Sequence, residues 1–222
     1  MMRRIYYLTE QRWAEKILAE RRLKLAQVES LNDPFEFLGV SLGESRTRQI
    51  MAVLHQHWSK TIGLLCTSAT WQSPVMWAHY GYKHQGVCLG FDVIDAEIHE
   101  VKYEPNRLVG LIDGLGPGKL MTEGQFTALL TTKFKEWEYE REWRMFARLD
   151  EREPKDGLYY FNFDPHLRLR EVILGARCET TVQEFAKKVP RSTDPVEVFK
   201  ARPAFESFQI VRQKQVQPII VA

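Results

Sequence analysis

The sequence predicts an α+β fold in which a single domain over residues 1–222 holds a mostly antiparallel central sheet flanked by helices. Three observations support this class. Helical patterns concentrate in the first half of the chain and strand patterns in the second, as in α+β folds. The length of 222 residues lies within the roughly 250 that one domain can reach. Hydrophobic residues make up 44% and charged residues 27% of the chain, so a substantial core can be buried.

Each element follows from the spacing of its apolar residues and from the residues at its ends. In the first half we predict a strand over 3–9, a helix capped by Thr9, an extended stretch over 23–31 and a helix over about 45–60. Next come a buried strand over 61–70, a helix that starts after Ser73 and ends at Gly81, a buried strand over 86–93 and an alternating strand over 97–104. In the second half we predict a glycine-rich loop over 108–120, a helix near 122–135, strands over 157–163, 169–176, 195–205 and 207–220, and a helix near 181–188.

The segment NDPFEF, residues 32–37, marks a break between elements. Asp33 is followed by Glu36 three residues later, with Pro34 at the first helical position, and this is the form of a capping box that opens a short helical turn. The same residues also fit a tight Asn-Asp-Pro turn. Both alternatives remain open.

Charge and cysteine usage limit the class of partner and the compartment. Lysine and arginine exceed aspartate and glutamate by only 31 − 29 = 2, and they are spread along the chain, which argues against a dedicated phosphate-tracking surface. Cys66, Cys88 and Cys178 lie in apolar surroundings and are predicted to be buried thiols in a reducing compartment. No apolar run approaches the roughly 20 residues of a membrane span, and the N-terminus lacks a signal-peptide pattern. We therefore expect a cytoplasmic location and no membrane partner.

The segment EWEYEREWRMFARL, residues 136–149, is the strongest candidate for chemistry. Strand alternation places Glu142 and Arg144 on one face, where the arginine would help to keep the carboxylate ionised. Neighbouring aromatic side chains would partly dehydrate these groups and strengthen their electrostatic effect. The alternative is a surface ladder of opposite charges, which contributes little. Glu138, Glu140 and Glu142 would repel one another on one extended face, so we expect the chain to change conformation between them.

A second candidate region follows the strand over 61–70. The hydroxyl groups of Thr67, Ser68 and Thr70 at the end of this strand either hold a ligand or satisfy backbone groups. In the next helix, Met76 and Trp77 are expected to belong to the core. The remaining candidates for a pocket wall are His79, Tyr80 and His84. The histidines lack an acid at neighbouring helical positions and the HExxH pattern is absent, so no metal site is predicted.

Five motifs make the chain resemble a bacterial family known as domain of unknown function 2971. They are RIYYLT at 4–9, LNDPFEF at 31–37, the strand end with Thr67 and Ser68, MWAHYGYKHQGVCLGFD at 76–92 and WEYEREWR at 137–144. The resemblance covers a core of about residues 4–148. The strands over 157–222 are left to complete the sheet.

The order of these motifs is similar to the layout of mono-ADP-ribosyltransferase cores, and this resemblance implies a split antiparallel sheet and NAD as the cofactor. Tyr7, or its neighbour Tyr6, matches the first element of that layout, and Ser68 matches the second. Glu142 matches the catalytic glutamate, with Glu140 as the other acid of the pair. Cleavage of the bond between nicotinamide and ribose passes through an oxocarbenium-like species, which a carboxylate beside the ribose stabilises.

The resemblance also implies the surroundings of the cofactor. Arg144 would orient Glu142. The residues assigned to the NAD pocket are Tyr7, Asn32, Asp33, Ser68, Trp77, His79, Tyr80 and His84. An alternative is that Asn32, Asp33, Trp77 and Arg144 maintain the fold. The implied partners are a nucleotide-like small molecule and an acceptor macromolecule, either protein or nucleic acid.

Two other functions stay open from the sequence. The first is a metal-assisted nuclease that uses Asp33, Glu36 and Glu142, which requires these carboxylates to converge. The second is a non-catalytic module whose aromatic pocket binds a nucleotide or nucleic acid.

Overall fold

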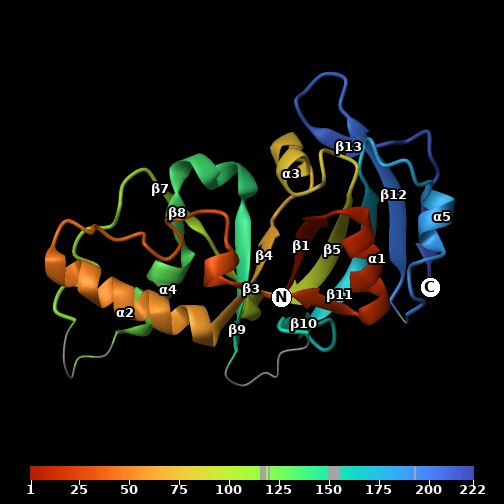
Figure 1. The fold of residues 1–222 in the computed structure, drawn as a ribbon. Coiled ribbons are helices and arrows are strands. Elements are labelled where there is room, and N and C mark those ends of the chain that lie inside the picture. Colours follow the sequence, from red (N-terminus) through yellow and green to blue (C-terminus); the bar gives the residue numbers. More distant parts are fainter. Residues whose placement is uncertain (116–118, 120, 150–155, 193) are drawn as a thin grey trace.

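The computed structural model describes residues 1–115, 119, 121–149, 156–192 and 194–222 (Figure 1). Its main feature is a ten-stranded sheet. In chain order the strands are β1 (Met2–Thr9), β3 (Ala26–Gln27), β4 (Ile62–Ser68), β5 (Val87–Ile94), β6 (His99–Glu100), β9 (Glu142–Arg148), β11 (Leu167–Leu174), β12 (Val196–Pro203), β13 (Ile210–Arg212) and β14 (Ile219–Val221). Across the sheet the order is β13, β12, β11, β5, β1, β4, β9 and β6, with β3 beside β4 and β14 beside β12.

Strand direction confirms the predicted sheet. Every neighbouring pair in the sheet is antiparallel except β11 and β12, which run parallel. The prediction of a mostly antiparallel sheet with helices is therefore confirmed. The central strands β1, β4 and β5 come from the first half of the chain, so strands are less concentrated in the second half than predicted. Strands from residues 157–222 pair in the same sheet as strands from residues 4–148.

Helices and two small strand pairs surround the sheet. The helices of the described residues are α1 (Gln11–Glu20), α2 (Ser45–Thr61), α3 (Pro74–His79), α4 (Glu123–Thr131) and α5 (Val182–Ala186), with 3-10 helices η1 (Val28–Ser30), η2 (Asp95–Glu97) and η3 (Lys135–Glu140). The small pairs are antiparallel β2 (Arg22–Lys24) with β10 (Tyr160–Asn162) and parallel β7 (Lys102–Glu104) with β8 (Thr132–Phe134). In Figure 1, α2 and α4 lie on one side of the molecule, whereas α1 and α5 lie on the other. None of the helices in the described part of the chain is long and apolar enough to cross a membrane.

Several elements differ from the sequence prediction at their ends. The N-cap of α1 is Glu10, because Thr9 is still paired in β1. The C-cap of α3 is Tyr80, one residue before the predicted stop at Gly81. Helix α4 ends at Thr131, because the chain then pairs as β8 with β7 and continues into η3.

Two predicted strands are each divided. The strand predicted over 97–104 forms β6 and β7, which pair with β9 and β8 respectively. Val101 lies between them and donates its N–H to the carbonyl of Glu142. The strand predicted over 207–220 forms β13 and β14, both of which pair with β12. Part of the loop predicted over 108–120 lies outside the described residues, and the rest forms bends and turns.

The sheet is split between β1 and β4. Strands β1 and β5 are paired at every residue of β1, and β4 and β9 at every residue of β4. In contrast, β1 and β4 meet at the single pair Tyr6 and Ser68. We call the strands β13, β12, β14, β11, β5 and β1 the β1 half, and β4, β9, β6 and β3 the β4 half. The facing edges of β1 and β4 are therefore largely free of backbone hydrogen bonds to each other.

The apolar core differs between the two faces of this split. On one face a single cluster crosses it, joining Ile5 and Phe91 of the β1 half to Leu65 and Met145 of the β4 half. On the other face the core is in two parts. One lies around Leu64 with α2 and α4, and the other lies around α3 with β1, β5, β11 and β12. The space between these two parts holds the candidate site.

Candidate functional site

A cavity of about 270 Å³ opens where β1 and β4 part. Strand β1 contributes Tyr6 and Tyr7, which reach it from opposite faces of the sheet because successive strand residues alternate. Burial raises the pKa of Tyr7 to about 12, so its hydroxyl stays protonated. Residues of β3, β4 and α3 complete the apolar walls. The polar floor is formed by Glu36, Lys133, Glu140 and Glu142.

The centre of this floor is the ion pair of Glu142 and Arg144. As predicted, the two side chains share one face of β9, and they meet as a two-point fork: Nε to Oε1 at 2.7 Å and Nη2 to Oε2 at 3.0 Å. Arg144 is completely buried and Glu142 is 4% exposed, so the alternative of a surface charge ladder is wrong. Arg144 also donates to the carbonyl of Leu130 and to Glu36 Oε1, at 2.7 and 2.8 Å.

Lys133 brings a second cation to the same carboxylates. Its Nζ lies 2.6 Å from Glu140 Oε2, 3.2 Å from Glu142 Oε2 and 3.3 Å from Glu36 Oε1. We call Glu36, Lys133, Glu140, Glu142 and Arg144 the ionic cluster. Three carboxylates and two cations give it a formal charge of −1, and all five side chains are buried. Buried charges need such partners, because an unpaired ion in the interior is strongly disfavoured.

The cluster keeps Glu142 ionised. Burial by itself raises the pKa of Glu142, but the charge and hydrogen bonds of Arg144, with the charge of Lys133, lower it to about 2. For Lys133, burial disfavours the charged form, yet the three surrounding carboxylates raise its pKa. Glu36 differs, since burial outweighs the nearby cations and raises its pKa. Its Oε2 atom is buried and accepts no hydrogen bond from any described residue. This oxygen is available to a donor group of a ligand.

Tyr80 and Asn32 form one wall of the cavity above Glu140. The Tyr80 hydroxyl donates to Glu140 Oε1 at 2.5 Å and accepts from Asn32 Nδ2 at 2.8 Å. Burial and the hydrogen bond to Glu140 raise the pKa of Tyr80. Tyr80 is thereby joined by hydrogen bonds to Asn32, 48 positions earlier in the sequence, and to Glu140, 60 positions later.

The side-chain hydroxyl groups at the end of β4 form hydrogen bonds with backbone groups. Ser68 Oγ donates to the carbonyl of Glu140 at 2.6 Å and accepts from the N–H of Thr70 at 3.2 Å. Thr67 Oγ1 donates to the carbonyl of Trp143 at 2.9 Å. These bonds fasten the start of β9 to β4 and so fix the position of Glu142. The chain changes from η3 to β9 at Arg141, which has a left-handed φ of 46°, as expected for a change of conformation within the acidic run.

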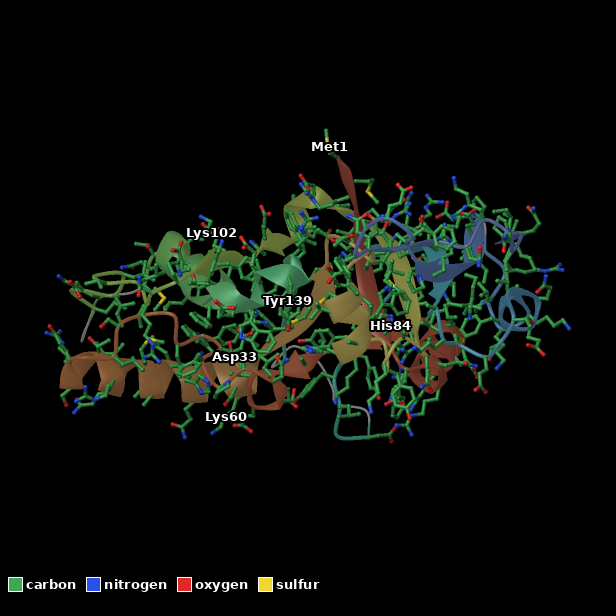
Figure 2. All side chains as sticks on the ribbon, turned by 90° about the horizontal axis from the view of Figure 1, so that it is seen from above. Met1, Asp33, Lys60, His84, Lys102 and Tyr139 are labelled. Carbon is green, nitrogen blue, oxygen red and sulfur yellow. The ribbon has the colours of Figure 1, made fainter. Side chains whose placement is uncertain are left out.

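Four of the residues assigned to the pocket do not line this cavity. Asp33 makes a tight turn, accepting from the N–H of Phe35 at 2.9 Å, so the turn alternative is correct and the helical one is wrong. Trp77 is fully buried, with Met76, in the core under α3, as predicted for both. His79 contacts the Tyr139 hydroxyl, and His84 stacks on Trp77. Figure 2 shows His84 apart from Asp33 and Tyr139, on the side of the β1 half.

The predicted residues that do converge on the cavity are Tyr7, Asn32, Ser68, Tyr80, Glu140 and Glu142, with Arg144 directly behind Glu142. The principal omission is Lys133. Its neighbour Lys135 is exposed and pairs with Glu138, and nothing in the segment TKFKEW distinguishes the buried lysine from the exposed one. Lys133 is buried and Lys135 exposed because the parallel pairing of β7 with β8 turns the Lys133 side chain inward.

The position that a metal ion would take among the carboxylates is filled by the Lys133 ammonium. Within the described residues, no group of three or more His, Cys, Asp or Glu side chains is arranged to hold a metal ion. Cys66, Cys88 and Cys178 are free thiols, with Cys88 and Cys178 buried and Cys66 half-buried.

Fold and site together define an α+β protein with a buried ionic cluster where its antiparallel sheet splits. Residues 76–145 match the family described as "Protein of unknown function (DUF2971)", which confirms the predicted resemblance over this segment of the chain. The matched segment contains Lys133, Glu140, Glu142 and Arg144. No curated protein and no solved structure matches the chain.

Proposed function

We propose that the chain cleaves the bond between nicotinamide and ribose in NAD and transfers ADP-ribose to an acceptor, in the manner of a mono-ADP-ribosyltransferase. The observation that carries this proposal is an ionised carboxylate, Glu142, at the floor of a cavity with largely apolar walls. In such surroundings a fixed negative charge stabilises a developing cation more strongly than it does in water.

The cavity fits the nicotinamide riboside part of NAD in three respects. Tyr6, Tyr7 and Tyr80 offer aromatic surface for a flat ring. The formal charge of −1 on the ionic cluster suits the positive charge of the pyridinium ring. The unpartnered Oε2 of Glu36 suits an N–H group such as that of the nicotinamide carboxamide.

The proposed reaction assigns a role to each residue of the floor. As the bond to nicotinamide breaks, its electron pair leaves with the neutral ring, and Glu142 stabilises the positive charge left on the ribose. Arg144 and Lys133 hold Glu142 in place. An acceptor hydroxyl or water then bonds to the ribose carbon, and Glu140 is placed to take the proton that is released.

The test measures nicotinamide release and transfer of label from NAD by the wild type, Glu142→Gln and Glu206→Gln. Glu206 is an exposed glutamate on the β12–β13 loop and serves as a matched control. We expect Glu142→Gln to lose at least about 100-fold in turnover, as when one electrostatic stabiliser of a transition state is removed. Glu206→Gln should match the wild type. Equal turnover by all three proteins, or no NAD binding by the wild type, would contradict the proposal.

A second candidate function is a nucleotide-binding module without catalysis. It is favoured by the fact that both oxygens of Glu142 already contact cations of the chain, Arg144 and Lys133. The same experiment separates the two candidates, since a binding module would bind NAD without releasing nicotinamide. The nuclease alternative is disfavoured, because the Lys133 ammonium occupies the centre of the carboxylates.

A further inference from the structure

A second pocket, of about 360 Å³, adjoins the cavity on the side of the sheet that Tyr7 faces. It lies between α1 and the small β2–β10 sheet, and its lining includes Trp13, Lys16 and Tyr160. The pocket and the cavity share two lining residues, Tyr7 and Lys24. We call it the α1 pocket. The two spaces are therefore neighbours on either side of Tyr7 and Lys24.

The α1 pocket has the opposite charge from the ionic cluster. Its charged lining consists of Lys16, Arg22 and Lys24 against the single acid Glu20, a formal charge of +2. Glu20 is held by Arg22, whose Nη2 lies 2.7 Å from Glu20 Oε2. Neither Lys16 nor Lys24 forms an ion pair with an acid among the described residues, and both are exposed. Among the described residues, Lys24 and Lys16, whose Nζ lies 6.0 Å from the Trp13 ring centroid, therefore offer two ammonium groups to an anion of two or more negative charges.

Flat aromatic surface lies beside these cations. Trp13 is 47% exposed on the first turn of α1, and the guanidinium of Arg12 lies 4.9 Å from its ring centroid. Tyr160 lies under the guanidinium of Arg22, at 3.7 Å from its ring centroid. Tyr160 is half-buried, so the exposed ring is that of Trp13, and an exposed aromatic ring next to cations is an arrangement on which nucleobases stack beside bound phosphates.

Size gives an independent reason to join the two spaces. Drug-sized ligands fill pockets of about 300–1,000 Å³. The cavity of about 270 Å³ at the sheet split is below that range and cannot enclose a dinucleotide. If NAD places its nicotinamide riboside there, as proposed above, its diphosphate and adenosine must lie outside. The α1 pocket is the neighbouring space, and Lys24 lines both.

We infer that the α1 pocket is the binding site for the adenosine diphosphate part of NAD, with Lys24 on the diphosphate and Trp13 against the adenine. This inference rests on the proposed function for its choice of ligand. The ligand then lies with its positive ring over the negative cluster and its negative diphosphate over the positive pocket. Tyr7 lies between the two parts.

Calorimetric binding of ADP and of nicotinamide riboside tests the two parts separately. Lys24→Gln should weaken ADP binding at least about 10-fold, as expected for one lost charge-assisted hydrogen bond, and should weaken nicotinamide riboside binding less than ADP binding, because the riboside carries no phosphate. Trp13→Ala should weaken ADP binding about 5-fold or more, as for the loss of one stacked base. Lys102→Gln is the matched control, an exposed lysine of β7 that lies on the side of the β4 half (Figure 2) and should leave both affinities unchanged.

The outcomes distinguish the inference from the proposed function. Failure of ADP to bind the wild type at millimolar concentration, or equal ADP affinity in wild type, Lys24→Gln and Trp13→Ala, overturns the inference. ADP binding that depends on Lys24 and Trp13 supports it, even where no nicotinamide is released. In that case the proposed transferase function fails while the adenine nucleotide pocket stands. Since Lys24 and Trp13 are exposed, both variants should fold, and their thermal unfolding is measured alongside.

Discussion

The two halves of the sheet are built differently on either side of the split. The β1 half is held by continuous backbone pairing, with β5 joined to β1 on one side and to β11 on the other, and it is covered by apolar side chains. The β4 half is equally well paired between β4 and β9, but next to the split it buries the ionic cluster. Stability in the first half comes from packing. In the second half, stability near the cavity depends on matched charges, which keep the buried Glu142 carboxylate ionised.

The largest expected effect on this comparison comes from Arg144→Met. The substitution removes the cation that both Glu142 and Glu36 contact, and removal of one partner from a buried ion pair costs about 3–5 kcal/mol of unfolding free energy. Ile5→Val, in the fully packed β1 half, should cost only about 0.5–1.5 kcal/mol. Urea unfolding of both variants measures the difference. A cost for Arg144→Met below that of Ile5→Val would break the comparison.

Acid should destabilise the protein through the same cluster. The pKa of Glu142 is about 2 in the fold against an ordinary value of 4.5, so its ionised form adds stability above pH 4.5 that is lost as pH falls through 2. The full effect is about 3 kcal/mol. Glu36 acts in the opposite direction: burial raises its pKa, so its contribution to stability increases as pH falls. Unfolding free energies measured between pH 5 and pH 2 should therefore fall less steeply in Glu142→Gln than in the wild type, whereas Glu36→Gln should keep the fall.

A smaller effect is expected from Tyr80→Phe. This change removes the hydroxyl that donates to Glu140 at 2.5 Å and should cost about 1.5–3 kcal/mol, the range for hydrogen bonds to charged groups. Tyr82→Phe is its control, since Tyr82 is 54% exposed and its loss of a hydroxyl should change stability by less than about 0.5 kcal/mol. Equal denaturation midpoints for the two variants would show that the wall of the cavity contributes nothing to holding Glu140.

Much of the fold could be predicted from the sequence, because apolar spacing and capping residues act locally. Ser73 with Pro74 starts α3, and α2 runs over Ser45–Thr61, within one residue of the predicted helix. The errors occurred where pairing with distant strands decided the outcome. The predicted strand over 97–104 is divided only because β6 and β7 have different partners, which no local pattern contains.

The parts of the site that follow from alternation along one strand could be predicted. The parts that depend on distant segments of the chain meeting in the fold could not. The shared face of Glu142 and Arg144 follows from their spacing alone. The meeting of these residues with Glu36, 108 positions earlier than Arg144, follows only from the tertiary fold. The same holds for Lys133, whose burial depends on β8. His79 and His84 were attractive by composition, but the helix and the turn that carry them direct both away from the cavity.

The single residue pair between β1 and β4 has a mechanical consequence. Within each half, many backbone hydrogen bonds resist deformation, but across the split only the pair of Tyr6 and Ser68 does so. The angle between the halves is therefore set by side chains: the apolar cluster packs across the split on one face, and on the other Asn32, Tyr80 and Glu140 are joined by hydrogen bonds. Such a joint lets the width of the cavity be adjusted by substitutions in its walls while both sheets stay intact.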